Sequence, residues 1–188
     1  TGFPATAAPF STFPNTGLGN QLRNVARMIA ARQALGSHRQ VFHVAIGGFD
    51  QHSGLINGHG GRMTELADAL AAFYQATVAL GVADSVTAFT ASDFGRTLDS
   101  NGEGSDHGWG GHHFIVGGSV KGGDLYGTWP DTVLRGANDV GRGNLLPTTS
   151  VVQYAATLAT WFGMSATQMP DVLPNSANFP QLGLGFMA

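Results

Sequence analysis

The sequence predicts an α/β fold in which parallel strands are joined by helices. Residues 41–46 form a β-branched and aromatic run that ends at two glycines, which is typical of a short buried strand. Residues 63–80 carry apolar side chains at helical spacing, and residues 85–90 form a second strand-like run. Strand, helix and strand in this order indicate a βαβ unit, whose strands are parallel and whose functional groups collect at the carboxyl ends of the strands.

Two further helices are predicted on either side of this unit. Residues 17–35 form an amphipathic helix that ends at Gly36, and its apolar stripe is Leu18, Leu22, Val25 and Ile29. Ser150 and Gln153 form a capping-box pattern, which predicts the start of another helix that stops at Gly163. The expected inward face of this last helix consists of Val151, Ala155, Leu158 and Phe162.

The remaining segments are predicted to be loops, short strands and a linker. Residues 1–16 contain three prolines and are interpreted as a linker or exposed N-terminal segment, and residues 17–188 as a single α/β domain. Residues 98–111 form a long polar, glycine-rich loop, which in a compact domain is more often functional than not. Residues 113–116 are expected to form a short strand, and residues 120–127 a turn with a short β segment.

Composition excludes several classes of function. The 188 residues carry a net charge of −3 with one lysine, so we expect no nucleic-acid partner. No apolar run approaches the roughly 20 residues of a membrane-spanning helix, so no membrane span is expected. There is no cysteine, which excludes disulfides and thiol catalysis. Any metal ion must therefore be held by His, Asp or Glu side chains.

A histidine-rich stretch at residues 105–114 is a prominent candidate for a functional site. It holds three of the seven histidines, His107, His112 and His113, next to Asp106 and among glycines that let a ligand approach the backbone. An alternative interpretation is a loop anchored by its aromatic side chains, with the histidines only completing hydrogen bonds. The clustering of histidine with Asp106 favours a metal ion or an anionic substrate.

Other polar side chains follow the two predicted strands of the βαβ unit. Asp50 and His52 flank one residue after the first strand, so in an extended chain both can face one side. Asp93 follows the second strand, where it is either a ligand or the cap of a turn. Arg96 either binds a phosphate or sulfate group through its planar guanidinium or pairs with a nearby aspartate.

Because the predicted topology collects these residues at one edge of the sheet, we expect a metal site there. Its expected ligands are Asp50, His52, Asp93, Asp106 and His107. Mixed carboxylate and imidazole ligands suit Zn²⁺ or Mn²⁺, with Mg²⁺ or Ca²⁺ as further candidates. Two such ions about 4 Å apart would activate a nucleophile and stabilise the leaving oxygen in phosphoryl or sulfuryl transfer. Arg96 is expected to bind the anionic substrate, and His112 to orient a ligand or the substrate.

A resemblance to a known family is carried by motifs that extend from about residue 42 to residue 186. They are Gly47-Gly48-Phe49-Asp50-Gln51-His52, Thr90-Ala91-Ser92-Asp93-Phe94-Gly95-Arg96-Thr97 and Asp106-His107-Gly108-Trp109-Gly110, followed by shorter glycine and threonine motifs. These motifs resemble a widespread bacterial family of unknown function that is related to the alkaline phosphatase and sulfatase superfamily.

This resemblance implies an alkaline phosphatase-like α/β sandwich, with a mostly parallel sheet between helices and metal ligands at the strand ends. It also implies export by the twin-arginine route, with a periplasmic or exported location, and a nucleophile in a missing N-terminal half. The chain is accordingly expected to be the C-terminal part of a longer protein that acts on small anionic esters. Phe94 departs from the superfamily, whose members usually have histidine directly after the aspartate that matches Asp93.

Two functions from different classes are compatible with these residues. The favoured hypothesis is a metal-dependent hydrolase of phosphate or sulfate esters, of which this chain carries the ligand-bearing C-terminal half. The alternative is a non-catalytic periplasmic binding or assembly module that keeps the fold, with or without one metal ion. Metal content and turnover of a chromogenic ester distinguish the two.

Overall fold

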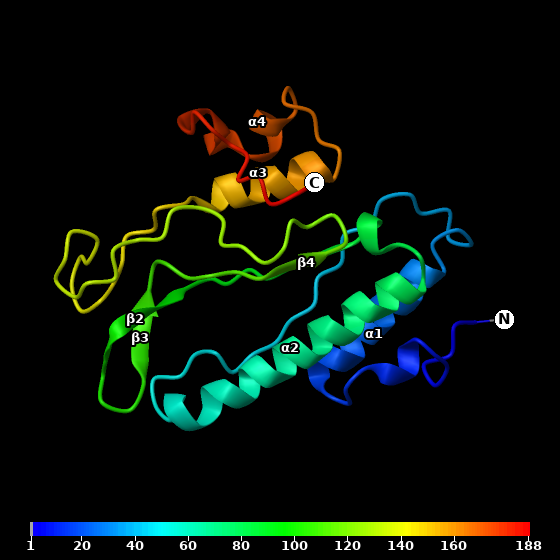
Figure 1. Cartoon of the computed structure of the whole chain (residues 1–188), viewed down its shortest axis with the longest axis horizontal. Helices are drawn as coiled ribbons and strands as arrows, with labels where there is room; N and C mark the ends of the chain where they lie inside the picture. Colours follow the sequence, from blue (N-terminus) through cyan, green and yellow to red (C-terminus); the bar gives the residue numbers. More distant parts are fainter. Residues whose placement is uncertain (1) are drawn as a thin grey trace. The chain divides into compact units, whose positions relative to one another are not determined.

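A computed structural model of the chain describes residues 2–188, which form two compact units. Unit 1 comprises the described residues up to Ala88 together with Asn101–Ser105 and Val116–Gly118. Unit 2 comprises Phe89–Ser100, Asp106–Ile115 and Ser119–Ala188. Figure 1 follows the chain by colour from its first residues to its last. Each unit has its own set of buried apolar side chains.

Unit 1 is built on two helices that pack side by side (Figure 1): α1, Gly17–Ala30, and α2, Leu55–Ala79. The chain enters α1 through Thr16, whose side-chain oxygen accepts a hydrogen bond from the Gly19 N–H at 3.1 Å. Gly81, with a φ of 66°, stops the chain from continuing α2. Both helices are those that the apolar periodicity predicts, although α1 stops earlier and α2 begins earlier.

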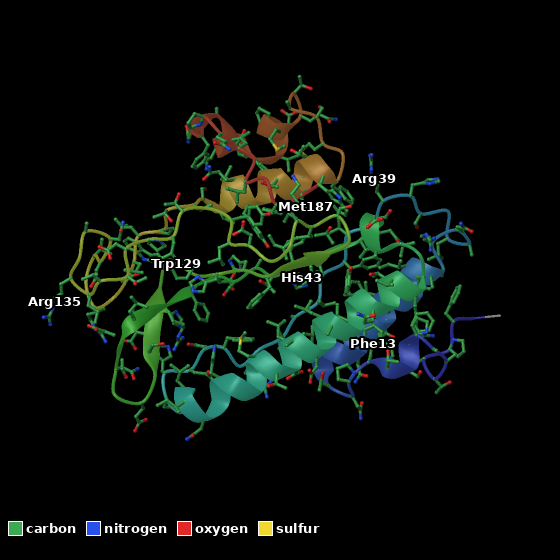
Figure 2. All side chains as sticks on the ribbon, in the orientation of Figure 1. Phe13, Arg39, His43, Trp129, Arg135 and Met187 are labelled. Carbon is green, nitrogen blue, oxygen red and sulfur yellow. The ribbon has the colours of Figure 1, made fainter. Side chains whose placement is uncertain are left out.

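The hydrophobic core of unit 1 lies between these helices and an N-terminal turn. This turn, η1 at Phe10–Thr12, buries Phe10, and the neighbouring Phe13 is only 5% exposed (Figure 2). Fully burying a side chain of this kind stabilises a fold by about 1.5–3 kcal/mol. The helices supply the rest of the core: Leu18, Leu22, Val25, Ala26, Ile29, Leu66, Ala69, Phe73 and Ala76. The segment predicted as a linker therefore contributes two side chains to the core.

The β-structure consists of two small antiparallel sheets, so the predicted mostly parallel sheet between helices is wrong. The pairs are β1, Thr87–Phe89, with β4, Ile115–Gly117, and β2, Gly95–Ser100, with β3, Ser105–Gly108. β1 and β4 lie where strands are predicted, but they pair with each other. The predicted βαβ unit is therefore not formed within residues 2–188.

Residues 41–46 are extended but join no strand of the described chain, and the reason is local. The side-chain amide of Gln21 donates to the Ala45 carbonyl at 2.9 Å and accepts from the Ala45 N–H at 3.0 Å. These two bonds satisfy backbone groups that a neighbouring strand would otherwise satisfy. The alternate side chains that pack against the helical core are Phe42, Val44 and Ile46. The period-two pattern thus marks an extended segment, but its apolar side contacts helices and not a sheet.

The segment predicted as a long loop at residues 98–111 contains most of the β2–β3 hairpin. Asn101 closes the hairpin turn, since its Oδ1 accepts hydrogen bonds from the N–H groups of Glu103 at 3.2 Å and Gly104 at 2.8 Å. The dipeptide Asn101-Gly102 is a hairpin signal in the sequence. The interpretation of this segment as an open loop is therefore wrong, because the turn chemistry outweighs its polar composition.

The helices of unit 2 are α3, Val151–Trp161, and the short α4, Met169–Val172. Both hydrogen bonds of the predicted capping box between Ser150 and Gln153 are present. Gly163, with a φ of 101°, follows the last turn of α3, as predicted. The buried face of α3 is Ala156, Thr157 and Leu158, whereas the predicted inward residues Val151 and Phe162 are 71% and 37% exposed. The expected inward face is therefore wrong at both ends of the helix.

The remaining regular elements are short. A 3₁₀ turn, η2 at Ala83–Ser85, follows α2 in unit 1, and another, η3 at Pro174–Asn178, follows α4 in unit 2. In place of the short β segment predicted at residues 120–127, Val120 makes a single antiparallel bridge with Met187. Within residues 2–188, no helix combines the length and the hydropathy that crossing a membrane requires.

Candidate functional site

Asp50 and His52 form a contact between a carboxylate and an imidazole at the surface of unit 1. Asp50 Oδ1 lies 3.0 Å from His52 Nε2, and the two side chains are 54% and 50% exposed. The backbone turns tightly at Asp50, since the Gln51 N–H donates to the Phe49 carbonyl at 3.1 Å. The two side chains that the sequence predicts to face one side are therefore in contact.

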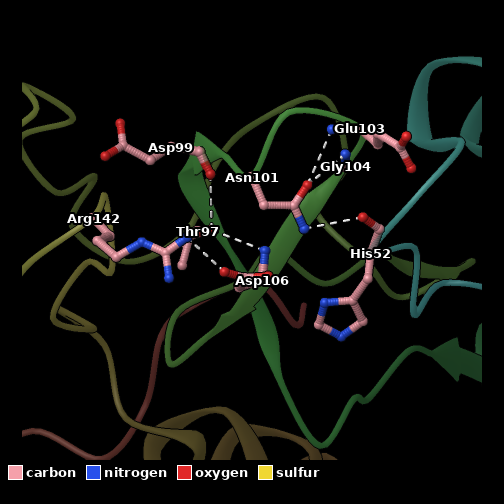
Figure 3. Close-up of polar contacts among 8 residues, drawn as sticks. All are labelled: His52, Thr97, Asp99, Asn101, Glu103, Gly104, Asp106 and Arg142. Atoms are coloured by element: carbon pink, nitrogen blue, oxygen red, sulfur yellow. Dashed lines mark hydrogen bonds and ion pairs between the residues drawn. The ribbon is translucent and has the colours of Figure 1, made fainter.

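The turn of the β2–β3 hairpin holds the backbone beneath this pair (Figure 3). Asn101 Nδ2 donates to the His52 carbonyl at 3.0 Å, and the Ser105 N–H donates to the Gln51 carbonyl at 3.4 Å. A Cβ on Gly104 would collide with the backbone of Gln51 and His52, so the two segments approach this closely only with glycine there. The side chains of the pair are exposed, but the backbone that carries them is fixed.

Asp50 and His52 of unit 1 are candidates to hold a metal ion, because each offers one ligand atom and both side chains are exposed. His107, which belongs to unit 2, is also exposed and offers an imidazole nitrogen of its own. Carboxylate oxygen and imidazole nitrogen are the usual ligands of zinc and related ions where cysteine is absent. An ion bound by Asp50 and His52 would take the place of the hydrogen bond between them.

His107, on β3, has its ring oriented by an aromatic neighbour. The imidazole stacks on the Phe94 ring, with 4.0 Å between centroids and 5° between planes. The guanidinium carbon of Arg96 lies 5.8 Å from the centroid of the same Phe94 ring. Phe94 therefore orients the exposed imidazole of His107.

Asp106, which precedes His107, is paired with a cation within unit 2 (Figure 3). Its Oδ2 accepts a hydrogen bond from Arg142 Nη2 at 2.6 Å. Its backbone N–H donates to Thr97 Oγ1 at 3.1 Å, which ties β3 to β2 at this point. To bind a metal ion, the Asp106 carboxylate has to leave Arg142 or share an oxygen with it.

Asp93 and His112 are the remaining predicted site residues of unit 2. Asp93 is exposed in the bend before β2, where Ser92 Oγ donates to the Phe94 carbonyl at 2.9 Å. His112 is also exposed and stacks on Trp129, with 4.9 Å between ring centroids (Figure 2). The roles of Asp93 as a ligand and of His112 as a substrate-orienting residue stay predictions.

His113, next to His112, is packed among aromatic and polar groups of unit 2. Its ring stacks on Tyr154 at 5.6 Å between centroids, and its Nδ1 lies 3.4 Å from Thr90 Oγ1. Partial burial lowers the pKa of His113 below its usual value, and the charge of His112 lowers it further. Burial also raises the pKa of Tyr154, whose hydroxyl donates to the Thr90 carbonyl at 3.1 Å. His113 is therefore a side chain that resists protonation.

Arg142 is the residue of this region that the sequence interpretation misses. Its guanidinium contacts one of the predicted ligands, Asp106, although the two residues lie far apart in the chain. The signal that the sequence offers is a single arginine between Gly141 and Gly143. Glycines on both sides permit a backbone conformation that most segments cannot adopt.

The fold and these contacts define a candidate metal-binding protein, with an exposed carboxylate–imidazole pair on a helical unit and an oriented imidazole on a hairpin. The chain belongs to the DUF1501 family, a family of proteins of unknown function, whose sequence model matches residues 3–167. Comparison with curated proteins and with solved structures found no match. The predicted membership of a family of unknown function is thus confirmed, and the relation to alkaline phosphatases and sulfatases stays a prediction.

Proposed function

We propose that this chain binds a divalent metal ion through Asp50 and His52 and that the bound ion serves the hydrolysis of a phosphate or sulfate ester. The observation that carries the proposal is the 3.0 Å contact between Asp50 Oδ1 and His52 Nε2 on a backbone held by the hairpin turn. The pair supplies one oxygen and one nitrogen ligand from neighbouring positions. Because the backbone is already ordered, little backbone conformational entropy remains to be lost when an ion binds.

Further ligands are proposed from the residues that the sequence singles out in unit 2. His107 is preferred, because its imidazole is exposed and its ring is held by Phe94. Asp106 is less available, since its carboxylate has to give up a hydrogen bond from Arg142. Asp93 is exposed and remains a proposed ligand. We therefore expect that removing the His107 imidazole weakens metal binding more than removing either carboxylate of unit 2.

The ligand chemistry favours Zn²⁺ or Mn²⁺ over Mg²⁺ or Ca²⁺, because imidazole nitrogen suits the first two ions and the last two prefer oxygen. A bound ion of this kind lowers the pKa of its water and stabilises negative charge on a leaving oxygen. Arg96 and His112 are proposed to bind the anionic group of the ester, the first through its guanidinium. A periplasmic or exported location, as the family resemblance implies, belongs to the same proposal.

A non-catalytic binding or assembly module is the second candidate function. The observation that favours it is the corrected fold, in which two small antiparallel sheets stand where the superfamily has a parallel sheet. Without that sheet, the ends of parallel strands do not supply the ligand positions on which the hydrolase hypothesis draws. A metal ion bound by the Asp50 carboxylate and the His52 imidazole is compatible with both functions. Metal binding and ester turnover therefore have to be measured separately.

Metal binding is tested by titrating the full chain with Zn²⁺ and Mn²⁺ and by measuring the metal content of the purified protein. We expect Asp50→Asn and His52→Ala each to weaken binding at least about tenfold. His38→Ala is the matched control, because His38 is exposed in a turn after α1 and is not among the proposed ligands. Binding that survives both substitutions would show that the pair is a surface hydrogen bond and not a metal site.

Turnover is tested with p-nitrophenyl phosphate and p-nitrophenyl sulfate in the presence of the ion that binds most tightly. The hydrolase proposal predicts ester cleavage that chelation abolishes and that Asp50→Asn and His52→Ala reduce, whereas His38→Ala does not. Metal binding without turnover of either ester by the full-length protein would reject the hydrolase and leave the non-catalytic module.

A further inference from the structure

We propose that Arg142 is an anion-binding residue of unit 2, which takes a phosphate or sulfate group in place of the Asp106 carboxylate. The inference rests on the proposed function, since it names the group that would hold the anionic part of the ester. Sequence reasoning assigns that task to Arg96 and His112, and Arg142 would be a further cation for it.

The loop that carries Arg142 is organised around a single carboxylate, that of Asp139. Its Oδ2 accepts the Arg135 N–H at 2.7 Å, and its Oδ1 accepts the N–H groups of Gly141 at 2.8 Å and Gly143 at 3.0 Å. These bonds hold the pKa of Asp139 below its usual value, with the Arg135 N–H contributing most. The Asp139 carboxylate is therefore charged near neutral pH, and the hydrogen bonds that it accepts order the loop.

The backbone at Arg142 adopts a conformation that arginine rarely adopts. Its φ is 59°, between Gly141 at 122° and Gly143 at 71°. The carbonyl groups of Arg142 and Gly143 accept hydrogen bonds from the N–H groups of Asp99 at 3.3 Å and Leu98 at 2.9 Å, which attach the loop to β2. A left-handed conformation at a residue other than glycine persists only when its surroundings enforce it, and such positions concentrate at functional sites.

The result is a guanidinium that is held in place and remains open to solvent. Arg142 Nη2 lies 2.6 Å from Asp106 Oδ2, while the arginine side chain is 62% exposed and the aspartate side chain 31% exposed. This contact uses one nitrogen of a planar fork that is shaped to bind two oxygens of a phosphate or sulfate. The Asp106 carboxylate thus occupies part of the Arg142 guanidinium. A phosphate or sulfate that binds there has to compete with this carboxylate.

Arg135 provides an internal comparison on the same loop. It also has a positive φ, 63°, and its side chain is also exposed (Figure 2). Its backbone N–H bonds Asp139, but no contact comparable to that of Arg142 with Asp106 is found for its side chain among the described residues. The two arginines therefore share charge, loop and backbone strain and differ in the contact with Asp106, which makes Arg135 the matched control.

The test is calorimetric titration of the full chain with inorganic phosphate, and separately with inorganic sulfate, without added metal. Arg142→Gly is the informative variant, because glycine accepts the positive φ without strain and removes the guanidinium together with its aliphatic stem. We expect it to weaken phosphate binding at least about tenfold, and Arg142→Lys to fall between it and the wild type. Arg135→Gly should stay within about twofold of the wild type, as a screened surface charge should.

The Asp106→Asn variant should change phosphate affinity in the opposite direction. Because the amide competes less strongly for the guanidinium than the carboxylate does, this variant should bind phosphate more tightly than the wild type. Circular dichroism and the thermal midpoint of each variant establish that the fold is intact. Equal phosphate affinity in the wild type and Arg142→Gly overturns the inference, and so does an equal loss in Arg135→Gly or no binding to the wild type at millimolar phosphate.

The outcomes separate this inference from the proposed function. Phosphate binding that depends on Arg142, in a chain that binds no metal through Asp50 and His52, supports the anion site and rejects the metal site. Metal binding through Asp50 and His52, together with phosphate binding that does not depend on Arg142, supports the metal site and rejects the anion site.

Discussion

At the scale of single residues, His113 shows most clearly how surroundings change chemistry. The ring lies against Tyr154 and Thr90, and His112 is the neighbouring titratable group. Partial burial and the charge of His112 both disfavour the protonated form, so the pKa of His113 is lower in the folded chain than the ordinary value of 6.5. The unfolded chain therefore binds this proton more strongly than the folded chain does.

This difference predicts a pH dependence of stability. With respect to His113, stability is highest above pH 6.5, where the ring is neutral in both states, falls as the pH drops through that value and becomes constant below the lowered pKa. Replacing His113 with asparagine should flatten the change in thermal midpoint between about pH 8 and about pH 5. His38→Asn is the control, because the exposed turn of His38 is distant in sequence from this aromatic cluster. An unchanged pH profile for His113→Asn would mean that the ring is not desolvated.

Which site residues the sequence can predict depends on how local their contacts are. The spacing of Asp50 and His52 predicts that both side chains face one side, and the structure has them in contact. Arg142 could not be assigned in this way, because its position depends on the Asp139 carboxylate and on bonds to β2. Its left-handed backbone is a tertiary property, and only the flanking glycines hint at it.

At the scale of elements, the close approach of the N-terminal segment to α1 depends on Gly19. A Cβ at this position would collide with the carbonyl oxygen and the ring of Pro14, next to the buried Phe13. Gly17, at the start of the same helix, has open space around it. The two glycines therefore differ in packing and share a helix.

We predict that Gly19→Ala destabilises the chain by about 1–3 kcal/mol, because the segment with Phe13 has to move off the helix. Gly17→Ala should be neutral or stabilising by up to about 1 kcal/mol, since alanine favours a helix over glycine. Urea denaturation measures both, with the midpoint compared at constant slope. Equal effects of the two substitutions would show that α1 responds to helix propensity alone and not to Pro14.

Element by element, the sequence predicts helices better than strands here. The core stripe of α1 and the capping box of α3 are local patterns, and both are confirmed. Residues 41–46 carry a sound strand pattern, but the amide of Gln21 bonds their backbone, and their apolar side chains pack on helices. Which surface covers an extended segment is decided by residues distant in sequence, and the local pattern does not contain that information.

At the scale of the whole molecule, the corrected fold changes what the family resemblance can support. Membership of a family of unknown function is confirmed, whereas the parallel sheet that would link the chain to alkaline phosphatases is not formed in residues 2–188. A parallel sheet needs pairing between strands that lie far apart in the chain, and no single segment reveals it. The functional hypothesis therefore depends on the side chains of the candidate site, with Asp50 and His52 at its centre.

The most direct test of that claim is a nuclear magnetic resonance titration of the full chain with Zn²⁺. The imidazole nitrogens of all histidines are observed together with the side-chain carboxyl carbons of the aspartates. We predict that the His52 imidazole and the Asp50 carboxyl signals shift together and saturate at one equivalent, while the His38 signals do not move. Signals of His52 and Asp50 that remain unchanged as Zn²⁺ binds elsewhere, or as no Zn²⁺ binds at all, would contradict the account.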